Sequence, residues 1–314
     1  MTRAVAEKTL RPKIIIILGA TGTGKTDLSL KLAPELDAEI ISADSMQVYR
    51  FMDIGTAKPS TGERARVKHH LIDIADPDEQ FNAARFAAKA GEIIRRLSAE
   101  GRVVLVVGGT GLYIRALTGG LIDGPSPDRE FRRGLREDLK KFGAARLHAR
   151  LKELDATAAS RIGVNDAVRI IRALEVCERG GESISKKQET HGFRQRHYDF
   201  LKIGLQLPRQ ELYDRINRRC EDMIERGIID EVRNLLARGY EKKARALHSL
   251  GYKHIIGYIR GDLLLEEALR LMQRDTRNFA KRQITWFGAD DDIEWFSPLA
   301  EESILARIRG FLDG

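Results

Sequence analysis

The sequence predicts an α/β protein whose parallel sheet is flanked by helices and whose chain carries an inserted, all-helical domain. Short, β-branched apolar runs alternate with helical patterns in the N-terminal part of the chain. Purely helical patterns follow from about residue 124, and a further apolar run returns near residue 200. A chain of 314 residues is long enough for two domains of ordinary size.

Five apolar runs predict the strands. Each is short, rich in β-branched residues and almost uninterrupted by polar residues, which is typical of strands buried on both faces of a parallel sheet. The runs are "KIIIIL" (13–18), "EIISA" (39–43), "HLIDI" (70–74), "RVVLVV" (102–107) and "FLKIGLQL" (200–207), the last of which is the final strand that we expect.

The segments between and after these runs have apolar residues at the spacing of an α-helix. In the α/β part we expect helices at 24–35, 83–98, after Gly111 and, near the C-terminus, at 262–287, with a helix break at 257–263. In the inserted part we expect helices at 129–141, 144–153 and 166–179, and a polar loop at 180–199.

The Pro- and Gly-rich segment "DGPSPDREF" indicates where the inserted domain begins. We therefore predict a catalytic core at 1–123 and 199–314, which includes the C-terminal helices, and an inserted helical domain at 124–198.

The composition narrows the class of protein. A net charge of +8 favours an anionic partner such as nucleic acid. Cys177 and Cys220 form no CxxC pattern, which suits a reducing cytoplasm. No apolar run approaches the length of a membrane span and no secretory signal is apparent, so we expect a cytoplasmic protein without membrane contact. The sequence indicates no protein partner.

The segment "GATGTGKT" predicts a phosphate site. It fits G-x-x-x-x-G-K-[ST] and lies between an apolar strand and a helix, which is the context that the motif requires. Its backbone N–H groups and the helix N-terminus favour an anion, Lys25 adds a positive charge, and the Thr26 hydroxyl can bind a magnesium ion (Mg²⁺). The phosphate-binding residues are Gly19, Ala20, Thr21, Gly22, Thr23, Gly24, Lys25 and Thr26. The core is therefore expected to resemble that of the P-loop NTPases.

The acid that nucleotide hydrolases usually place at the end of a second strand is absent from this sequence. The strand at 102–107 ends instead in Gly108, Gly109 and Thr110, which would permit a ligand to approach closely. Asp44 follows the strand at 39–43. It could bind Mg²⁺, act as a general base toward an acceptor or cap a helix, and the spacing alone leaves these alternatives open.

Seven segments resemble one enzyme family. They are "GATGTGKT", "ISADSMQVYRFMDIGTAKPS", "HHLIDI", "VVGGTGLYIRAL", "NDAVRIIRALEV", "GYKHIIGYIRG" and "RNFAKRQITWF". In this order and spacing they are similar to the tRNA dimethylallyltransferases, also called tRNA isopentenyltransferases, over residues 13–296. The zinc-finger cluster of some eukaryotic members is missing, so the chain resembles the bacterial type.

This resemblance implies a reaction. The family transfers a dimethylallyl group from dimethylallyl diphosphate to N6 of the adenosine on the 3′ side of the anticodon and releases diphosphate. By resemblance, Asp44 is the general base, Thr110 lies close to the target adenosine, and Lys25 acts with Mg²⁺ on Thr26 to stabilise the leaving diphosphate. Arg219 matches an arginine that approaches the same diphosphate, although its position alone would suggest a solvated helix residue.

The resemblance also implies RNA contacts. Asp44, Ser45, Met46 and Gln47 match the strip that reads the flipped base, and the inserted domain matches the part that grips the anticodon stem-loop. The expected contacts in the insertion and beyond it are Arg132, Val168, Arg169, Ile170, Ile171, Arg172 and Lys253. Arg277 and Lys281 belong either to the active site or to an exposed charged stripe.

Two alternative functions share the phosphate loop. A P-loop kinase of a small molecule or nucleoside could use Asp44 as its base. A non-enzymatic RNA-binding regulator could use the positive charge without any group transfer. The basic helical insertion and the specific downstream motifs argue against the kinase.

Overall fold

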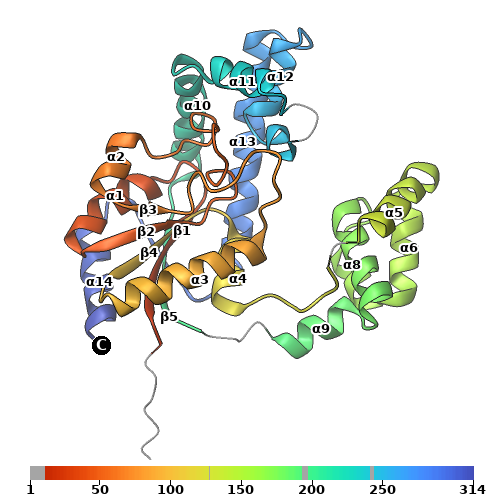
Figure 1. Cartoon of the computed structure of the whole chain (residues 1–314), viewed down its shortest axis with the longest axis horizontal. Coiled ribbons are helices and arrows are strands. Elements are labelled where there is room, and N and C mark those ends of the chain that lie inside the picture. The colour runs from red at the N-terminus through yellow and green to blue at the C-terminus, as the bar shows by residue number, and fades with distance from the viewer. Residues whose placement is uncertain (1–10, 127, 193–196, 241–243) are drawn as a thin grey trace, which may run out of the picture. The chain divides into compact units, whose positions relative to one another are not determined.

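The computed structural model describes residues 11–126, 128–192, 197–240 and 244–314 (Figure 1). The chain divides into two compact units, one formed by Met1–Thr118 with Arg196–Gly314 and the other by Gly119–Gln195. The boundaries predicted from composition, 124 and 198, lie a few residues further along the chain.

A parallel sheet organises the larger unit. The strand order is β3-β2-β4-β1-β5-β6, and every neighbouring pair is parallel, as the alternating pattern predicted. The first five strands are β1 (Lys13–Gly19), β2 (Ala38–Ser42), β3 (His69–His70), β4 (Val103–Gly108) and β5 (Asp199–Leu205).

Two strand predictions were wrong. A sixth strand, β6 (Ile293–Phe296), pairs with β5 although the sequence did not suggest it, because it is short and follows a run of aspartates. The strand predicted at 70–74 ends at His70, because Leu71 and Asp73 both adopt positive φ values (62° and 57°) that an extended strand does not allow.

The predicted core helices are present, with small differences in length. They are α1 (Lys25–Glu35), α3 (Ala83–Ala99), α4 (Gly111–Gly119) and α13 (Leu265–Phe287), which begins three residues later than expected. The helix break predicted at 257–263 is present but lies slightly later, because α12 continues to Ile259. Further elements are α2 (Thr61–Arg66), α10 (Arg209–Glu225), α11 (Ile228–Ala237), η1 (Arg245–His248), α12 (Tyr252–Ile259) and α14 (Glu301–Asp313).

One face of the sheet is closed by α1 and α14. Leu28 and Leu32 of α1 and Ile304 of α14 pack in one cluster with strand residues such as Ile15 and Leu105, and all five side chains are buried. Burying an aliphatic side chain of this size contributes roughly 1.5–3 kcal/mol. The phosphate loop that joins β1 to α1 is thus anchored by hydrophobic packing on both of its sides.

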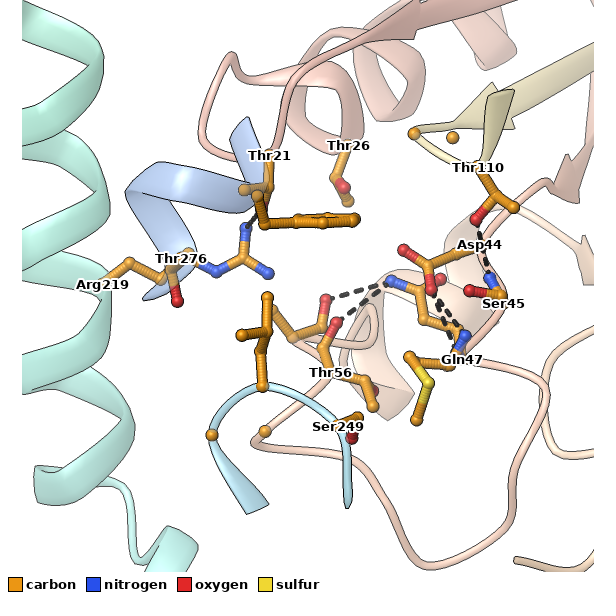
Figure 2. A pocket seen from close by; sticks show the side chains of 18 of the residues that line it. Thr21, Thr26, Asp44, Ser45, Gln47, Thr56, Thr110, Arg219, Ser249 and Thr276 are labelled. Carbon is orange, nitrogen blue, oxygen red and sulfur yellow. Dashed lines mark hydrogen bonds between the residues drawn. The ribbon is translucent and has the colours of Figure 1, made fainter. Parts of the chain in front are cut away.

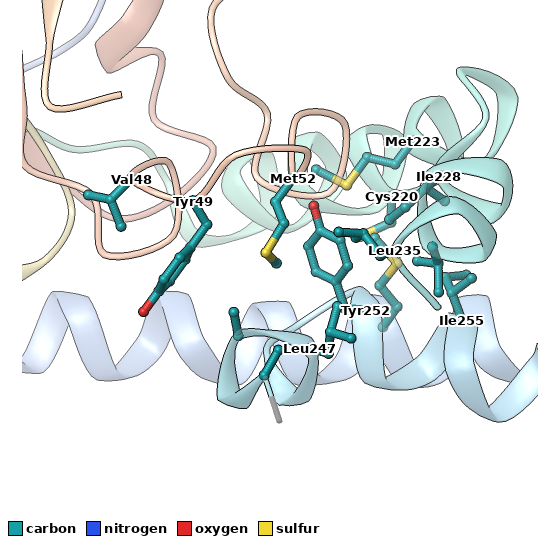
Figure 3. Close-up of a cluster of buried hydrophobic side chains, with 14 of the residues drawn as sticks. Val48, Tyr49, Met52, Cys220, Met223, Ile228, Leu235, Leu247, Tyr252 and Ile255 are labelled. Carbon is teal, nitrogen blue, oxygen red and sulfur yellow. The ribbon is translucent and has the colours of Figure 1, made fainter. Parts of the chain in front are cut away.

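A second hydrophobic cluster joins the segment after β2 to the C-terminal helices (Figure 3). Met52 packs against Tyr252 and the helices α10 to α13, and Tyr252 itself is fully buried. The Tyr252 hydroxyl donates to Glu231 Oε1 at 2.7 Å. Glu231 in turn accepts the backbone N–H groups of residues 53, 54 and 55 at 2.8, 2.7 and 3.1 Å. This carboxylate therefore holds the loop at 53–57 against the helices.

Among the described residues of the smaller unit, all regular elements are helices. Its helices are α5 (Arg129–Phe142), α6 (Ala144–Leu154), α7 (Ala156–Arg161), α8 (Ala167–Gly180) and α9 (Ile184–His191). The first, second and fourth match the three predicted helices, whereas α7 was not expected.

The prediction of a polar loop at 180–199 was wrong for its central part, because that part forms α9. Residues 193–196 of the predicted loop lie outside the described residues. The Ser183 side chain caps α9 by accepting the Lys186 N–H, and Gly192 ends it in the left-handed conformation. No residue of α9 is buried, so the helix has no apolar period for the sequence to reveal.

Glu175 is the buried charge of the smaller unit. Its side chain is fully buried and accepts hydrogen bonds from Arg132 at 2.6 and 2.8 Å, from Arg172 and from the Asp128 N–H at 2.9 Å. Burial alone would raise its pKa, but these hydrogen bonds and the Arg132 charge prevail and lower it. Arg132 and Arg172 therefore stabilise this unit, whatever else they contact.

We expect Glu175→Ala to destabilise the helical unit by about 3 kcal/mol, because it leaves two arginines without their buried partner. Hydrogen exchange of the full chain should then show faster exchange in α5 and α8. In the unmutated protein the same stabilisation should be lost in acid, as the pH falls through the lowered pKa of Glu175. The control is Glu178→Ala, which removes a more exposed ion pair with Arg150 and should cost less than about 1 kcal/mol. Equal effects of the two variants would contradict the assignment.

Candidate active site

A cavity of about 380 Å³ lies where the carboxyl ends of β1, β2 and β4 meet (Figure 2). Ligands of open α/β sheets bind at this edge. Its lining comes from the phosphate loop, the turn after β2, the loop at 55–59, the ends of β3 and β4, the segment at 248–252 and the helices α10 and α13, among others. The segments that the sequence singled out separately therefore converge on one site.

The phosphate loop has the conformation that its glycines permit. Gly22 and Gly24 have φ values of 86° and 87°, in the left-handed region that favours glycine. A Cβ atom on Gly19 would lie 2.6 Å from the Leu205 carbonyl oxygen, so β5 also excludes a side chain there. Lys25 Nζ donates to the Ala20 carbonyl at 2.6 Å and spans the loop.

Arg219 extends from α10 to the same loop. Its Nη1 donates to Thr21 Oγ1 at 3.3 Å, and both residues line the cavity (Figure 2). The helix position that suggested a solvated arginine therefore places it beside the phosphate loop, as the resemblance implied.

Burial and a neighbouring cation disfavour the charged form of Lys25. Burial and the Arg219 charge together lower the pKa of Lys25 to about 7, although the Asp44 charge partly opposes them. Burial also lowers the pKa of Arg219, again partly opposed by Asp44. Two cations held with little solvent next to a loop of N–H donors form a strong site for a multiply charged anion.

Of the three roles that the sequence position of Asp44 allowed, the structure excludes the helix cap, and the roles of base and Mg²⁺ ligand stay predictions. Its Oδ1 accepts the N–H groups of Met46 at 2.8 Å and Gln47 at 3.3 Å, which fixes a turn rather than a helix. Because both of these bonds go to Oδ1, the second oxygen, Oδ2, is the one able to accept a proton from a ligand in the cavity that Asp44 lines.

Thr110 is bound directly to the Asp44 turn. Its Oγ1 accepts the Ser45 N–H at 3.0 Å, and its own N–H donates to the Ala43 carbonyl at 3.2 Å. A Cβ on Gly108 would lie 2.2 Å from that carbonyl. The glycine is thus needed for the contact between two strand ends. Gly108 and Gly109 also line the cavity, so the close approach of a ligand that we expected stays a prediction.

Gln47 connects the Asp44 turn to the loop at 53–57. Its Oε1 accepts the Ser42 hydroxyl at 2.9 Å, and its Nε2 donates to the Ala57 carbonyl at 3.3 Å. Ser45, Met46 and Gln47 all line the cavity, where their side chains are partly buried.

Helix α13 supplies lining residues that the sequence did not single out. Thr276, Phe279 and Gln283 lie three and four residues apart on one helical face, and Arg282 joins them at the cavity. Of the charged stripe that we considered, Arg277 donates instead to Asn217 Oδ1, and Lys281 is exposed. The helical spacing of Thr276, Phe279 and Gln283 was the sequence signal that could have identified them as lining residues.

The residues expected to contact RNA differ in accessibility. Val168 is 81% exposed, and Arg169 is exposed and forms only a 3.4 Å pair with Asp166. The prediction that Ile170 and Ile171 contact RNA was wrong, because their side chains are buried in the core of the smaller unit and are unavailable to a ligand. Lys253 pairs with Asp275 at 2.7 Å on the outside of α12.

We expect Lys25 to titrate near pH 7, because burial and Arg219 both disfavour its charged form. Brief acylation at a series of pH values, followed by peptide mass analysis, measures the midpoint. Lys31 on the same helix is the control, since Glu301 raises its pKa. Asp44→Asn should lower the Lys25 midpoint and Arg219→Gln should raise it. A Lys25 midpoint as high as that of Lys31, unchanged by either variant, would contradict this description of the site.

Comparison with known proteins agrees with this geometry. The family model described as IPP transferase matches residues 47–290. A tRNA dimethylallyltransferase 2 of Syntrophus aciditrophicus is 50% identical over 304 residues, which cover 97% of this chain and 98% of that protein. A tRNA dimethylallyltransferase 1 of Citrifermentans bemidjiense is 48% identical over 98% of this chain and 99% of its own.

Solved structures give the same result. The full-length tRNA isopentenylpyrophosphate transferase of Bacillus halodurans superposes with a TM-score of 0.72 and 38% identity, covering 96% of this chain and 97% of its own. A eukaryotic dimethylallyltransferase acting on tRNA gives a TM-score of 0.78 and 28% identity, covering 95% and 77%. The chain has a P-loop core with a carboxylate in the same cavity as its phosphate loop. The family model matches most of the chain, and relatives about 50% identical match nearly all of it, so the chain belongs to the IPP transferase family.

Proposed function

We propose that this protein transfers a dimethylallyl group from dimethylallyl diphosphate to N6 of the adenosine 3′-adjacent to the anticodon of a tRNA and releases diphosphate. The observation that carries the proposal is that Asp44 and the Lys25–Arg219 pair line one cavity. A base for an acceptor and a cradle for an anionic leaving group are thus available to the same reaction.

The chemistry assigns a role to each group. Adenine N6 is a weak nucleophile, so Asp44 Oδ2 accepts a proton from it as the new bond forms between N6 and C1 of the allyl group. The C1–O bond breaks at the same carbon, and the electron pair leaves with the diphosphate. Lys25, Arg219 and the loop N–H groups stabilise the charge that develops there. Thr110 keeps the Asp44 turn in place through the Ser45 N–H.

Mg²⁺ fits this site as a cofactor. Magnesium is usually bound by one or two protein groups together with phosphate oxygens, and the Thr26 hydroxyl lines the cavity beside the loop. Within the described residues no cluster of three or more His, Cys, Asp or Glu could hold a metal by itself. When bound, the ion would neutralise part of the charge on the leaving diphosphate.

The tRNA contacts are assigned to two regions. We propose that Ser45, Met46 and Gln47 recognise the flipped base within the cavity, since all three line it. In the smaller unit, Val168 and Arg169 present an exposed apolar and cationic pair at the start of α8. Lys253 remains a candidate phosphate contact, because its ion pair with Asp275 is partly exposed and an ion pair of this kind stabilises the folded protein only slightly.

The alternatives predict different behaviour. Family membership does not favour a kinase, and a kinase would require ATP for its product. An RNA-binding regulator would bind tRNA without any turnover. We further propose that the enzyme acts in the cytoplasm, where its tRNA substrate is found. None of the helices in the described parts of the chain is both long and apolar enough to cross a membrane.

We expect Asp44→Asn to slow transfer at least about 100-fold, because the amide cannot accept the N6 proton. Single-turnover transfer of a labelled dimethylallyl group measures this rate, and filter binding at the same protein concentration should show tRNA affinity close to that of the unmutated enzyme. The control is Asp214→Asn on the exposed side of α10, which should change neither. Turnover by Asp44→Asn at the unmutated rate would disprove the role of the base, and an equal loss of tRNA affinity would show that the residue acts in binding.

We expect Arg169→Ala to weaken tRNA binding and to reduce the slope of log affinity against log salt by about one, because one counterion-releasing contact is lost. Titrations from low to physiological salt measure this slope. Arg309→Ala is the control, since it removes an exposed arginine of α14 that pairs with Glu35. An identical slope for Arg169→Ala and the unmutated protein would remove Arg169 from the RNA contacts.

A further inference from the structure

Gln283 connects the two sides of the active site. It lies on α13, far along the chain from both of its partners, and only 7% of it is exposed. Its Oε1 accepts the Thr21 N–H of the phosphate loop at 2.9 Å, and its Nε2 donates to the Gly109 carbonyl at the end of β4 at 2.8 Å. One side-chain amide therefore bridges the phosphate loop and the strand end that carries Thr110.

These partners define the orientation of the amide. If the amide were rotated by half a turn, its NH₂ would face the Thr21 N–H and its oxygen would face the Gly109 carbonyl, and two hydrogen bonds would become two repulsive contacts. The backbone around Gln283 is also shaped to it, because a Cβ on Gly109 would lie 2.4 Å from Nε2. Glutamine supplies an acceptor and a donor at this distance from the helix at any pH, whereas glutamate, which has the same length, supplies both only when it is protonated.

The bridge continues to the reacting groups on both sides. On the side of the phosphate loop, the Thr21 hydroxyl accepts a hydrogen bond from Arg219. Beyond Gly109, the next residue is Thr110, whose Oγ1 is bound to the N–H of Ser45, adjacent to Asp44. Gln283 therefore adds a buried side-chain link between the cations and the base, beyond the last paired residues of β1 and β4 (Leu18 and Gly108).

We propose that Gln283 is a positioning residue of the transfer reaction, which holds the phosphate loop at the distance from the Asp44–Thr110 turn that in-line displacement requires. It acts through Thr21 and Gly109 and needs no contact with substrate. The proposal rests on the transfer reaction proposed above. A misplacement of about 1 Å can reduce a rate about 100-fold, so the residue is expected to affect kcat more than KM.

Gln283→Met tests the bridge, because it keeps a similar volume and removes both hydrogen bonds. The expected result is a fall in kcat of at least tenfold with KM for the donor and for tRNA changed less than threefold. Gln273→Met is the control on the same helix, since the bonds of Gln273 among the described residues go to Asn217 and Glu221, away from the phosphate loop. It should retain full activity, and thermal unfolding of both variants shows whether each is folded at the assay temperature.

Gln283→Glu provides a readout that loss of stability alone does not produce. An ionised carboxylate still accepts from Thr21 but repels the Gly109 carbonyl, whereas a protonated carboxyl group restores both bonds. Burial and the facing carbonyl raise the pKa of such a group. The rate of the variant relative to the unmutated enzyme should therefore rise as the pH is lowered from 9 to 6. Taking this ratio at each pH removes the shared contribution of the ionisable groups lining the cavity, which are Lys25, Asp44, His69, Arg219, Cys220, His248, Tyr252 and Arg282.

The outcomes separate this inference from the proposed function. Transfer by the unmutated enzyme together with full kcat in folded Gln283→Met would overturn the positioning role alone. A pH-independent rate ratio for Gln283→Glu would also overturn it. Absence of transfer by the unmutated enzyme would instead contradict the proposed function.

Discussion

The interaction on which the site depends is the electrostatic repulsion between Lys25 and Arg219, which are held with little solvent against one phosphate loop. Burial and the Arg219 charge lower the pKa of Lys25 to about 7, and the Asp44 charge partly opposes these effects. Such an arrangement costs stability while the cavity lacks an anion and recovers it when an anion binds. The fold must therefore hold both cations in place by other means, and much of the surrounding structure does so.

Three sets of contacts provide that support. Hydrophobic packing fixes β1 and α1 on either side of the loop, and Gln283 ties Thr21 to the end of β4. On the opposite side of the cavity, Glu231 and Tyr252 hold the loop at 53–57 against the C-terminal helices. All three are built from segments distant in sequence, so the geometry of the site depends on the completed fold rather than on any one motif.

The sequence predicted the sheet, the phosphate loop and Asp44 because each depends on local composition: β-branched runs, glycines at fixed spacing, and an acid at a strand end. It did not predict β6 or α9, because neither has the periodic burial that reveals an element. The buried Ile170 and Ile171 were misassigned because a family motif says which residues recur in a segment and not which way each side chain points. Gln283 and Glu231 were missed for a related reason, since their partners lie far away in the chain and become neighbours only in the folded protein.

We infer that the phosphate loop of this protein holds the leaving group of a prenyl donor rather than a nucleotide undergoing hydrolysis. The decisive measurement is mass analysis of one purified tRNA after incubation with the protein, Mg²⁺ and dimethylallyl diphosphate in the absence of ATP. We expect the addition of one dimethylallyl group to the nucleoside on the 3′ side of the anticodon, with release of one diphosphate for each group transferred. An unchanged tRNA mass under these conditions, or a product that forms only when ATP is added, would contradict it.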